Sequence, residues 1–295
     1  MDIEIALIIY NRPEHTKEVL AGLRREGVTS FSVFMDAASL REDKERQKEL
    51  FDLLLSIDWA DIKIYKHKYN LGLAKSIRYA VEYTLSDSDA VIILEDDCVP
   101  RPGFMSYMKR ALHLYKNRVQ VRSICGYNYP NLELDYGQDD VTFLKRFCPW
   151  GWATWSDRWP RFNPNLKEIV EEIVASGTEL SSMGRDIERY CNDPIFLNGK
   201  SDTWSINWIL AHYLTDTYAV FPKQSLIDNI GFDGTGVHCT DTDVFQHEVE
   251  ADTFQVKALP REIQYKPENE VIIRSFLELN SLKTMQKTSS TEQVQ

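Results

Sequence analysis

The segment from Ala90 to Asp97 constrains the fold of this chain more than any other part of its sequence. Five apolar residues run there directly into three carboxylates, Glu95, Asp96 and Asp97. An apolar run of this length indicates a strand buried on both faces, which is typical of a parallel sheet. The carboxylates then follow the strand at its carboxyl end, the edge where open α/β sheets bind their ligands.

Three adjacent carboxylates favour a bound cation. They repel one another, and their removal from water is costly unless a cation compensates the charge. Mg²⁺ or Mn²⁺ would suit, because such ions prefer oxygen ligands and commonly bind substrate phosphates as well. The alternative is a solvated acidic turn, but the apolar strand before the triplet favours the metal. A nucleotide diphosphate is the obvious anion for that metal to neutralise.

The composition allows one large α/β domain or two small ones, because the chain has 295 residues and 43% of them are hydrophobic. The net charge of -11 argues against a general binder of nucleic acid or anionic membranes, although a local basic pocket for a diphosphate is compatible with it. The five cysteines contain no CxxC pair, so neither a disulfide framework nor a zinc site is indicated. With neither a signal peptide nor a transmembrane stretch evident, we expect a cytoplasmic protein.

Predicted strands and helices alternate over the first hundred residues. The alternation indicates a mostly parallel central sheet flanked by helices, a Rossmann-like α/β fold. Gly-rich Walker and dinucleotide fingerprints are absent. The predicted strands are residues 3–10, 31–35, 61–65 and 91–94, and the predicted helices are residues 14–25, 42–56 and 74–85.

The second half of the chain differs in character, since four of the seven tryptophans fall within residues 150–159. Residues 225–239 are rich in Gly and Asp and predict a loop. Helices are predicted at residues 104–115, 166–175, 183–191, 201–214 and 271–282, with a strand near residues 121–126.

Polar side chains follow each of the first three predicted strands, at the edge where the triplet lies. A carboxylate there can accept hydrogen bonds from a ribose or a base N–H. Asp36 alone is more typical of a turn or cap residue, but together these side chains line one edge of one sheet. They are Tyr10 and Arg12 after the first strand, Asp36 after the second, and Asn70, Lys75 and Arg78 after the third.

These motifs resemble those of a glycosyltransferase of the GT-A fold. The resemblance rests on Ile-Ile-Tyr-Asn-Arg-Pro at the first strand end, on Asp36, on the Asn70-Leu-Gly-Leu turn and on the acidic triplet. The triplet is similar to the acidic metal motif of the N-acetylglucosaminyltransferase I group and of family-2-like bacterial sugar transferases. The resemblance is strongest over residues 3–100 and looser in the later segments.

The resemblance implies a metal-dependent hexosyl- or N-acetylhexosaminyltransferase of polysaccharide biosynthesis. It would move a sugar from a nucleotide diphosphate donor, with a UDP-sugar expected, to a glycan or lipid-linked acceptor. The acceptor could bring peripheral membrane contact. Asp97 would contact the metal, while Glu95 and Asp96 would contact the ribose or the donor sugar. The nucleotide would lie over the side chains that follow the first two strands.

We expect one GT-A domain over residues 1–282. Within it, residues 1–100 would form a nucleotide-binding half and residues 101–282 a tryptophan-rich acceptor-side half. The polar residues 283–295 predict a flexible tail.

Sugar transfer with inversion needs a carboxylate that takes a proton from the acceptor hydroxyl. Asp202 is the first candidate, because it lies beside Trp204 at a predicted helix start, much as a Trp/Asp-rich segment carries the base in the N-acetylglucosaminyltransferase I group. Its alternative role is that of an N-cap or first-turn acid, which a helix start favours anyway. Asp233 is the reserve candidate, and inversion is favoured because such candidates exist.

His238 lies in a glycine-rich segment late in the chain, which suits a lid over the diphosphate. Many GT-A enzymes place a late histidine on the metal, so His238 is the second candidate metal ligand. A lone histidine is otherwise more often a surface or core residue.

The tryptophan-rich segment has two interpretations. Aromatic faces stack on sugars and glycine permits close approach, so Trp150, Gly151 and Trp152 are expected to approach the donor or acceptor. Trp155 and Trp159 are expected to pack. The alternative is that all four tryptophans form a hydrophobic core between the two halves.

Two other functions stay open. A sugar-1-phosphate nucleotidyltransferase shares the arrangement of strand, carboxylate and metal, but it usually has a Gly-rich loop with Arg or Lys after its first strand, unlike residues 10–13. A non-catalytic carbohydrate-binding protein would account for the tryptophans and leave the acidic triplet unexplained.

Overall fold

A computed structural model of the protein describes residues 1–200, 204–234, 242–247 and 254–291. Its strands are β1 (Ile3–Ile9), β2 (Ser30–Met35), β3 (Asp61–Lys66), β4 (Ala90–Glu95), β5 (Cys98–Pro100), β6 (Val121–Cys125), β7 (Val141–Leu144), β8 (Trp152–Trp155), β9 (Tyr218–Pro222) and β10 (Ile227–Asn229). Its α-helices are α1 (Pro13–Arg25), α2 (Asp43–Leu55), α3 (Leu73–Leu85), α4 (Phe104–Tyr115), α5 (Leu166–Ala175), α6 (Arg185–Asn192), α7 (Pro194–Leu197), α8 (Ser205–Leu214) and α9 (Pro267–Thr291). Two 3₁₀ helices are η1 (Trp159–Arg161) and η2 (Leu180–Met183).

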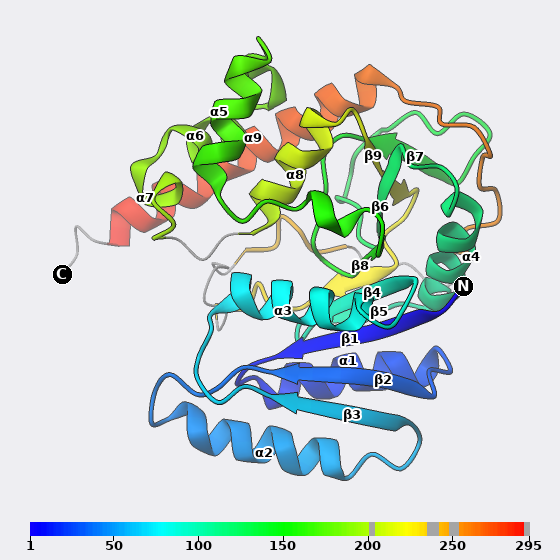
Figure 1. Cartoon of the computed structure of the whole chain (residues 1–295), viewed down its shortest axis with the longest axis vertical. Coiled ribbons are helices and arrows are strands. Elements are labelled where there is room, and N and C mark those ends of the chain that lie inside the picture. The colour runs from blue at the N-terminus through cyan, green and yellow to red at the C-terminus, as the bar shows by residue number, and fades with distance from the viewer. Residues whose placement is uncertain (201–203, 235–241, 248–253, 292–295) are drawn as a thin grey trace.

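The fold is α/β, with a mixed, mostly parallel sheet of eight strands in the order β3-β2-β1-β4-β8-β6-β9-β7 (Figure 1). β3, β2, β1 and β4 are parallel to one another, as are β6 and β9. β8 and β7 are antiparallel to their neighbours. The order 3-2-1-4 is that of a Rossmann-like half, so the carboxyl ends of these four strands share one edge.

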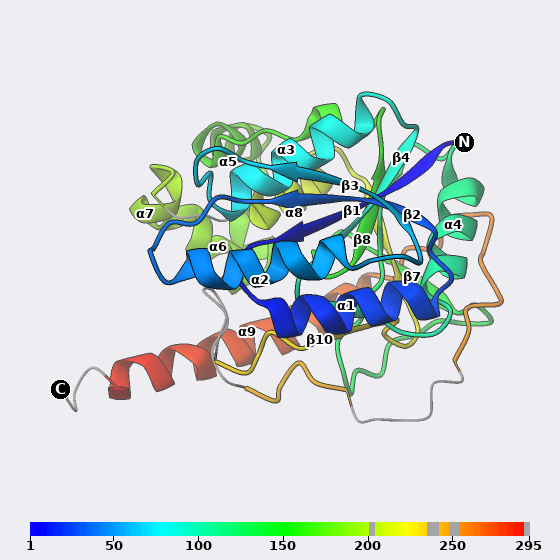
Figure 2. The ribbon, with the colours of Figure 1, turned by 90° about the horizontal axis from the view of Figure 1, so that it is seen from below.

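Helices cover both faces of this sheet. α1 and α2 lie on one face of the first four strands, and α3 lies on the other face, on the side of α5 and α8 (Figure 2). Residues 91–94 of β4 are fully buried because β1 and β8 flank the strand and α3 packs over it. This is the two-sided burial that the apolar sequence of β4 predicts.

The alternating elements of the first hundred residues are confirmed, and those of the second half only partly. The predicted loop at 225–239 contains β10, which pairs with β5 as a small antiparallel ribbon. The predicted helix at 183–191 is divided, because Gly184 at φ 115° ends η2 before α6 begins. The described part of the predicted helix 201–214 begins at Ser205, and α9 extends on both sides of the predicted 271–282. None of the helices described here is long and apolar enough to span a membrane.

Candidate functional site

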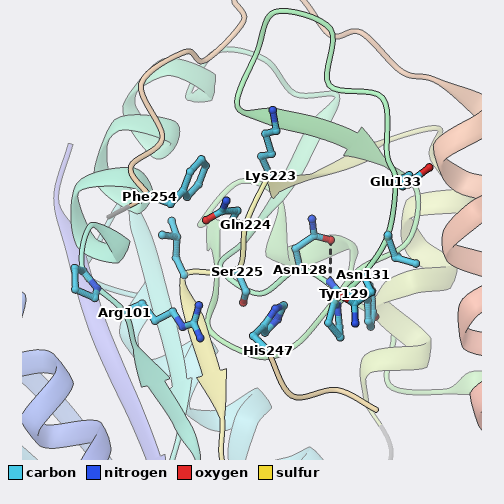
Figure 3. Close-up of a pocket in the computed structure, with 14 residues that line it drawn as sticks. Arg101, Asn128, Tyr129, Asn131, Glu133, Lys223, Gln224, Ser225, His247 and Phe254 are labelled. Carbon is cyan, nitrogen blue, oxygen red and sulfur yellow. Dashed lines mark hydrogen bonds between the residues drawn. The ribbon is translucent and has the colours of Figure 1, made fainter. Parts of the chain in front are cut away.

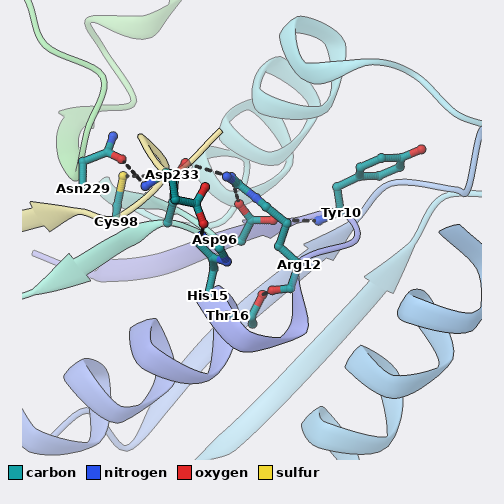
Figure 4. A network of polar contacts seen from close by, with 10 residues as sticks. Tyr10, Arg12, His15, Thr16, Asp96, Cys98, Asn229 and Asp233 are labelled. Atoms are coloured by element: carbon teal, nitrogen blue, oxygen red, sulfur yellow. Dashed lines mark hydrogen bonds and ion pairs between the residues drawn. The ribbon is translucent and has the colours of Figure 1, made fainter. Parts of the chain in front are cut away.

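Arg12 forms ion pairs with Asp96 and Asp97 at the carboxyl ends of β1 and β4 (Figure 4). The register pairs Ile8 of β1 with Glu95 of β4, so the residues that follow these strands meet at one edge. Arg12 Nη2 donates to Asp97 Oδ2 at 2.8 Å and also to Asp96 Oδ1. The two carboxylates are only 10% and 7% exposed, so the guanidinium compensates charges whose burial would otherwise be costly. We call these four residues, Arg12 and 95–97, the carboxylate site.

Burial and repulsion change the ionisation of the carboxylate site. Loss of water, followed by the charges of Asp97 and Asp96, raises the pKa of Glu95 to about 8. Burial also raises the pKa of Asp96, while the charge of Arg12 acts in the opposite direction. Within the described part of the chain, no hydrogen-bond donor contacts the Glu95 carboxylate. The site therefore presents one carboxylate that a proton or an added cation would stabilise.

Residues 229–233 cover this network from the second half of the chain. The Ile230 N–H donates to the Asp97 carbonyl at 3.0 Å. Gly231 lies so close that a Cβ there would meet Asp97 Oδ2 at 2.2 Å. His15, in the first turn of α1, pairs with Asp233 Oδ2 at 3.1 Å, which places the reserve base candidate at the rim of the carboxylate site.

The loops after β2 and β3 are tied together by Asp36. Its carboxylate accepts the N–H groups of Leu71 at 2.9 Å and of Gly72 at 2.9 Å, and Asn70 Nδ2 donates to the Ala37 carbonyl at 2.7 Å. Asp36 is 6% exposed. Asp36 thus has the turn-holding role that its type favours, and Asn70 is brought to the same edge.

Tyr10 is anchored through its hydroxyl group, which donates to Asp43 Oδ2 at 2.7 Å and lies 2.7 Å from Ser39 Oγ. Its backbone N–H points to Asp96 Oδ2 at 3.4 Å. The Tyr10 backbone therefore lies beside the carboxylate site, and its side chain is held by Ser39 and Asp43, which follow β2 in the chain.

A pocket of about 530 Å³ lies between α3 and the helices of the second half, and we call it the α3–α8 pocket. Lys75 and Arg78 of α3, both predicted from sequence, line one side, and Trp204 and Asn207 from the start of α8 line the other. The described residues that line it are Ala74, Lys75, Arg78, Phe162, Pro164, Asn165, Leu166, Lys167, Phe196, Leu197, Asn198, Gly199, Trp204 and Asn207.

A second cavity, of about 450 Å³, lies beyond the carboxyl ends of β6 and β9 (Figure 3). Its lining mixes basic, acidic and amide groups, with Arg101, Lys223, Glu133 and Asn128 among them. Arg101 is already paired with Asp228 of β10 at 2.7 Å. None of the described residues that were singled out from the sequence lines this cavity.

Two of the three predictions for the tryptophan segment need correction. Trp152 is fully buried in β8, where it packs against Trp159 and Trp204, so it belongs to the core and cannot contact a ligand in this arrangement. The close approach at Gly151, φ 63°, is to Ile227 of β10 rather than to a ligand, since a Cβ there would meet that side chain at 2.5 Å. The alternative interpretation, in which the tryptophans form a hydrophobic core, therefore applies to Trp152.

Trp150 lies between the core and the surface. It is partly buried, with its ring 4.6 Å from that of Tyr127 and 5.2 Å from that of Phe232, both edge to face. Asp202 and His238 lie outside the described residues, so their predicted roles stay predictions. Among the side chains that are described, no group of three or more His, Cys, Asp or Glu is arranged to hold a metal ion.

Sequence reasoning missed two contributors to these sites. His15 was given no role, although its place at the start of the helix after Arg12 puts it at the same sheet edge as the triplet. Asn207 was also missed, although it follows Trp204 by three residues and therefore shares its side of the helix start. The helical spacing was the available signal in both cases.

No family model and no curated protein matches this sequence. Solved structures give weak similarities. One is TarS 1-349 of S. aureus, with 12% identity and a TM-score of 0.35, over 53% of this chain and 47% of that structure. Another is the mannosyltransferase PcManGT from Pyrobaculum calidifontis, in complex with GDP-Man and Mn²⁺, with 12% identity and a TM-score of 0.34, over 64% and 50%.

A third similarity is to a UDP-glucose pyrophosphorylase complexed with UDP-glucose, with 10% identity and a TM-score of 0.40, over 77% of this chain and 93% of that structure. The chain spans about half the length of the TarS and PcManGT structures. TM-scores at this level assign no activity to the chain, so its function is argued from its own residues.

Proposed function

We propose that the chain is a glycosyltransferase that moves a sugar from a nucleotide diphosphate to a glycan or lipid-linked acceptor, with a UDP-sugar as the donor and with inversion. The observation that carries the proposal is the carboxylate site. Three acidic side chains end a fully buried parallel strand at the edge where open α/β sheets bind ligands. The resemblance of the same residues to the acidic motif of GT-A enzymes supports this assignment.

The chemistry of the carboxylate site fits a divalent cation. Mg²⁺ and Mn²⁺ prefer oxygen donors, and Mg²⁺ is commonly held by one or two carboxylates together with substrate phosphates. Asp97 is the proposed ligand, and His238 is proposed as a second. When bound, the cation would supply neutralisation of the charge on the leaving diphosphate. It would compete with Arg12 for Asp97 Oδ2, because Arg12 bonds that oxygen at 2.8 Å.

The chain's own groups would orient the two substrates. Tyr10, Asp36 and Asn70 are proposed to hold the nucleoside, because they cluster at the ends of the first strands beside the carboxylate site. Arg12, once released from the carboxylates, would bind a phosphate, as a guanidinium does with two parallel N–H donors. Glu95 and Asp96 are proposed to contact the ribose or donor sugar, while Lys75, Arg78 and Trp150 line the approach to it.

The proton of the acceptor hydroxyl would pass to a carboxylate. Asp202 is proposed as that base, since it precedes Trp204 of the α3–α8 pocket by two residues. Asp233 is the reserve, because its carboxylate is 44% exposed at the rim of the carboxylate site.

The proposal is tested by incubating the protein with UDP-sugars and Mn²⁺ and measuring UDP release, with EDTA and with Asp97→Ala as controls. Metal-dependent UDP release that Asp97→Ala abolishes supports a transferase. Formation of UTP from a UDP-sugar and pyrophosphate, without UDP release, would identify a nucleotidyltransferase instead. Absence of both reactions over a panel of UDP-, GDP- and dTDP-sugars would overturn both enzyme assignments.

A further inference from the structure

The α3–α8 pocket concentrates positive charge in an acidic protein. The chain has a net charge of -11, yet the charged side chains among the described lining residues are Lys75, Arg78 and Lys167, all basic. Lys75 forms no ion pair with any described residue. Arg78 pairs with Glu82 at 3.6 Å, and Lys167 pairs with Glu171 at 3.9 Å. Both pairs lie on exposed helix surfaces, so the glutamates offset these positive charges only weakly.

The indole of Trp204 also lines this pocket. Its N–H has no acceptor among the residues described, and its nitrogen is not one of the fully buried polar atoms that lack a partner. The N–H can therefore donate to an oxygen of a ligand in the pocket. Asn207, 2% exposed, donates from Nδ2 to the Asn163 carbonyl at 2.9 Å, and no described donor contacts its Oδ1, which can therefore take a ligand hydroxyl.

The walls of the pocket suit a sugar ring. Phe162 and Phe196 supply apolar faces, and Asn165 and Asn198 supply amide groups. α5 and α8 both begin at the pocket, so the positive ends of their dipoles add to the basic side chains. A volume of about 530 Å³ is within the range of pockets for small ligands.

We propose that the α3–α8 pocket binds an anionic saccharide, that is, a glycan whose carboxylate or phosphate group pairs with Lys75, Arg78 and Lys167 while the Trp204 N–H donates to one of its oxygens. As the acceptor of the transfer, this glycan would contact Trp204, which follows Asp202 by two residues in the sequence. The assignment as acceptor rests on the proposed function, whereas the anionic character of the ligand rests on the pocket alone.

Binding is measured by titration calorimetry on the full chain, without donor, at low and high salt. Trigalacturonic acid supplies the carboxylate and glucose 6-phosphate the phosphate, and maltotriose is the neutral comparison. We expect at least one acidic compound to bind about tenfold or more tightly than maltotriose, with affinity that falls as salt rises. Whichever acidic compound binds more tightly identifies the acidic group.

The variant Lys75→Glu/Lys167→Glu should weaken that binding by about tenfold or more, since two attractive charges become repulsive. Its control is Lys44→Glu/Lys48→Glu on the exposed surface of α2, which makes the same change in net charge and should bind as the original chain does. Trp204→Phe keeps an aromatic ring and removes the N–H, and should weaken binding about threefold to tenfold.

Three results would overturn the inference: neither acidic compound binds at 10 mM, maltotriose binds as tightly as both, or the pocket variant binds as its α2 control does. UDP release from UDP-sugars is measured on the same samples. Retained UDP release without binding of the acidic compounds would reject the anionic ligand and leave the transferase standing. Binding of an acidic compound without any donor turnover would support the anionic ligand and reject the transferase.

Discussion

The carboxylate site and the α3–α8 pocket differ in how far their charges are compensated by other residues of the chain. In the carboxylate site, Asp96 and Asp97 are buried and each is bonded to Arg12, so most of the charge is compensated inside the molecule. In the pocket, Lys75 has no ion-pair partner and the Trp204 N–H has no acceptor among the described residues. The charges of the first site are thus compensated within the described chain, whereas the groups of the second have no such partners there.

This difference bears on how each site would bind. A cation that enters the carboxylate site must displace Arg12. Its net binding free energy is therefore the difference between the carboxylates bound to the cation and the carboxylates bound to Arg12. An anion that enters the pocket displaces no ion-pair partner of Lys75 among the described residues. The pocket should therefore bind its ligand without rearrangement, and the carboxylate site should rearrange when it binds. Substitutions in either site test this difference.

Asp97→Ala should have the largest effect on binding. We expect it to weaken Mn²⁺-dependent binding of UDP by at least about 100-fold, or roughly 2.7 kcal/mol, because the proposed protein oxygen ligand is removed. Calorimetric titration with UDP and Mn²⁺ measures the change. Asp87→Ala, an exposed acid after α3, is the control. Unchanged metal-dependent affinity in Asp97→Ala would reject Asp97 as the ligand.

Asp202→Asn should separate transfer from donor binding. Loss of a general base typically lowers the rate by about 10²–10⁴-fold, while UDP affinity should stay the same because no donor contact is removed. Steady-state transfer to the acceptor, compared with UDP binding, measures the two effects. A rate within about tenfold of the original chain would exclude Asp202, and the same assay on Asp233→Asn would then test the reserve.

Arg12→Ala tests the internal compensation directly. Removing one partner of a buried pair leaves uncompensated charge, so we expect a loss of about 2–4 kcal/mol in the free energy of unfolding. Arg78→Ala breaks an exposed pair with Glu82 and should cost about 1 kcal/mol or less. Urea unfolding in EDTA measures both.

Arg12→Ala also tests whether Arg12 and a metal ion compete for Asp97. If Arg12 and a metal share Asp97, Mn²⁺ should raise the melting temperature of Arg12→Ala by more than it raises that of the original chain. An equal rise in both proteins would show that Arg12 does not compete with the cation.

The contrast between the sites also explains how far the sequence could predict them. The alternating strands and helices from β1 to β4 were predicted correctly, because apolar runs, turns and helical spacing are local signals, whereas the short strand β5 was not predicted. The later strands β7, β8 and β9 are only four or five residues long and pair with distant partners, so no local pattern marked them. Trp152 was misjudged for that reason, since its burial depends on the insertion of β8 between β4 and β6.

The triplet was predicted as a group of carboxylates in need of a cation, and the cation in this structure is Arg12. The choice of Arg12 depends on the adjacency of β1 and β4, which spacing alone does not specify. The α3–α8 pocket was predicted only through Lys75 and Arg78. Its other wall comes from three helices distant in sequence from α3, so these residues come together only in the folded chain.

Glu95→Gln should change the free energy of unfolding by an amount that depends on pH. The pKa of Glu95 is raised to about 8 in the folded chain, against about 4.3 for a glutamate in an unfolded chain. Between these values the folded state holds a proton that the unfolded state has lost, so the free energy of unfolding falls as pH rises. Glutamine carries no such proton. The free energy of unfolding of the variant should therefore rise relative to that of the original chain as the pH rises from 5 to about 8, and the difference should level off above pH 8.

Urea unfolding in EDTA over this pH range measures the gain, and the exposed α2 substitution Glu49→Gln serves as the control that should show no such trend. If the free energies of unfolding of Glu95→Gln and of the original chain change in parallel from pH 5 to pH 8.5, Glu95 is ionised throughout. Arg12 would then compensate all three carboxylates, and a metal would find no uncompensated carboxylate in the carboxylate site. A gain at high pH would instead leave Glu95 as the one group in that site that, like Lys75 in the pocket, lacks a partner within the described chain.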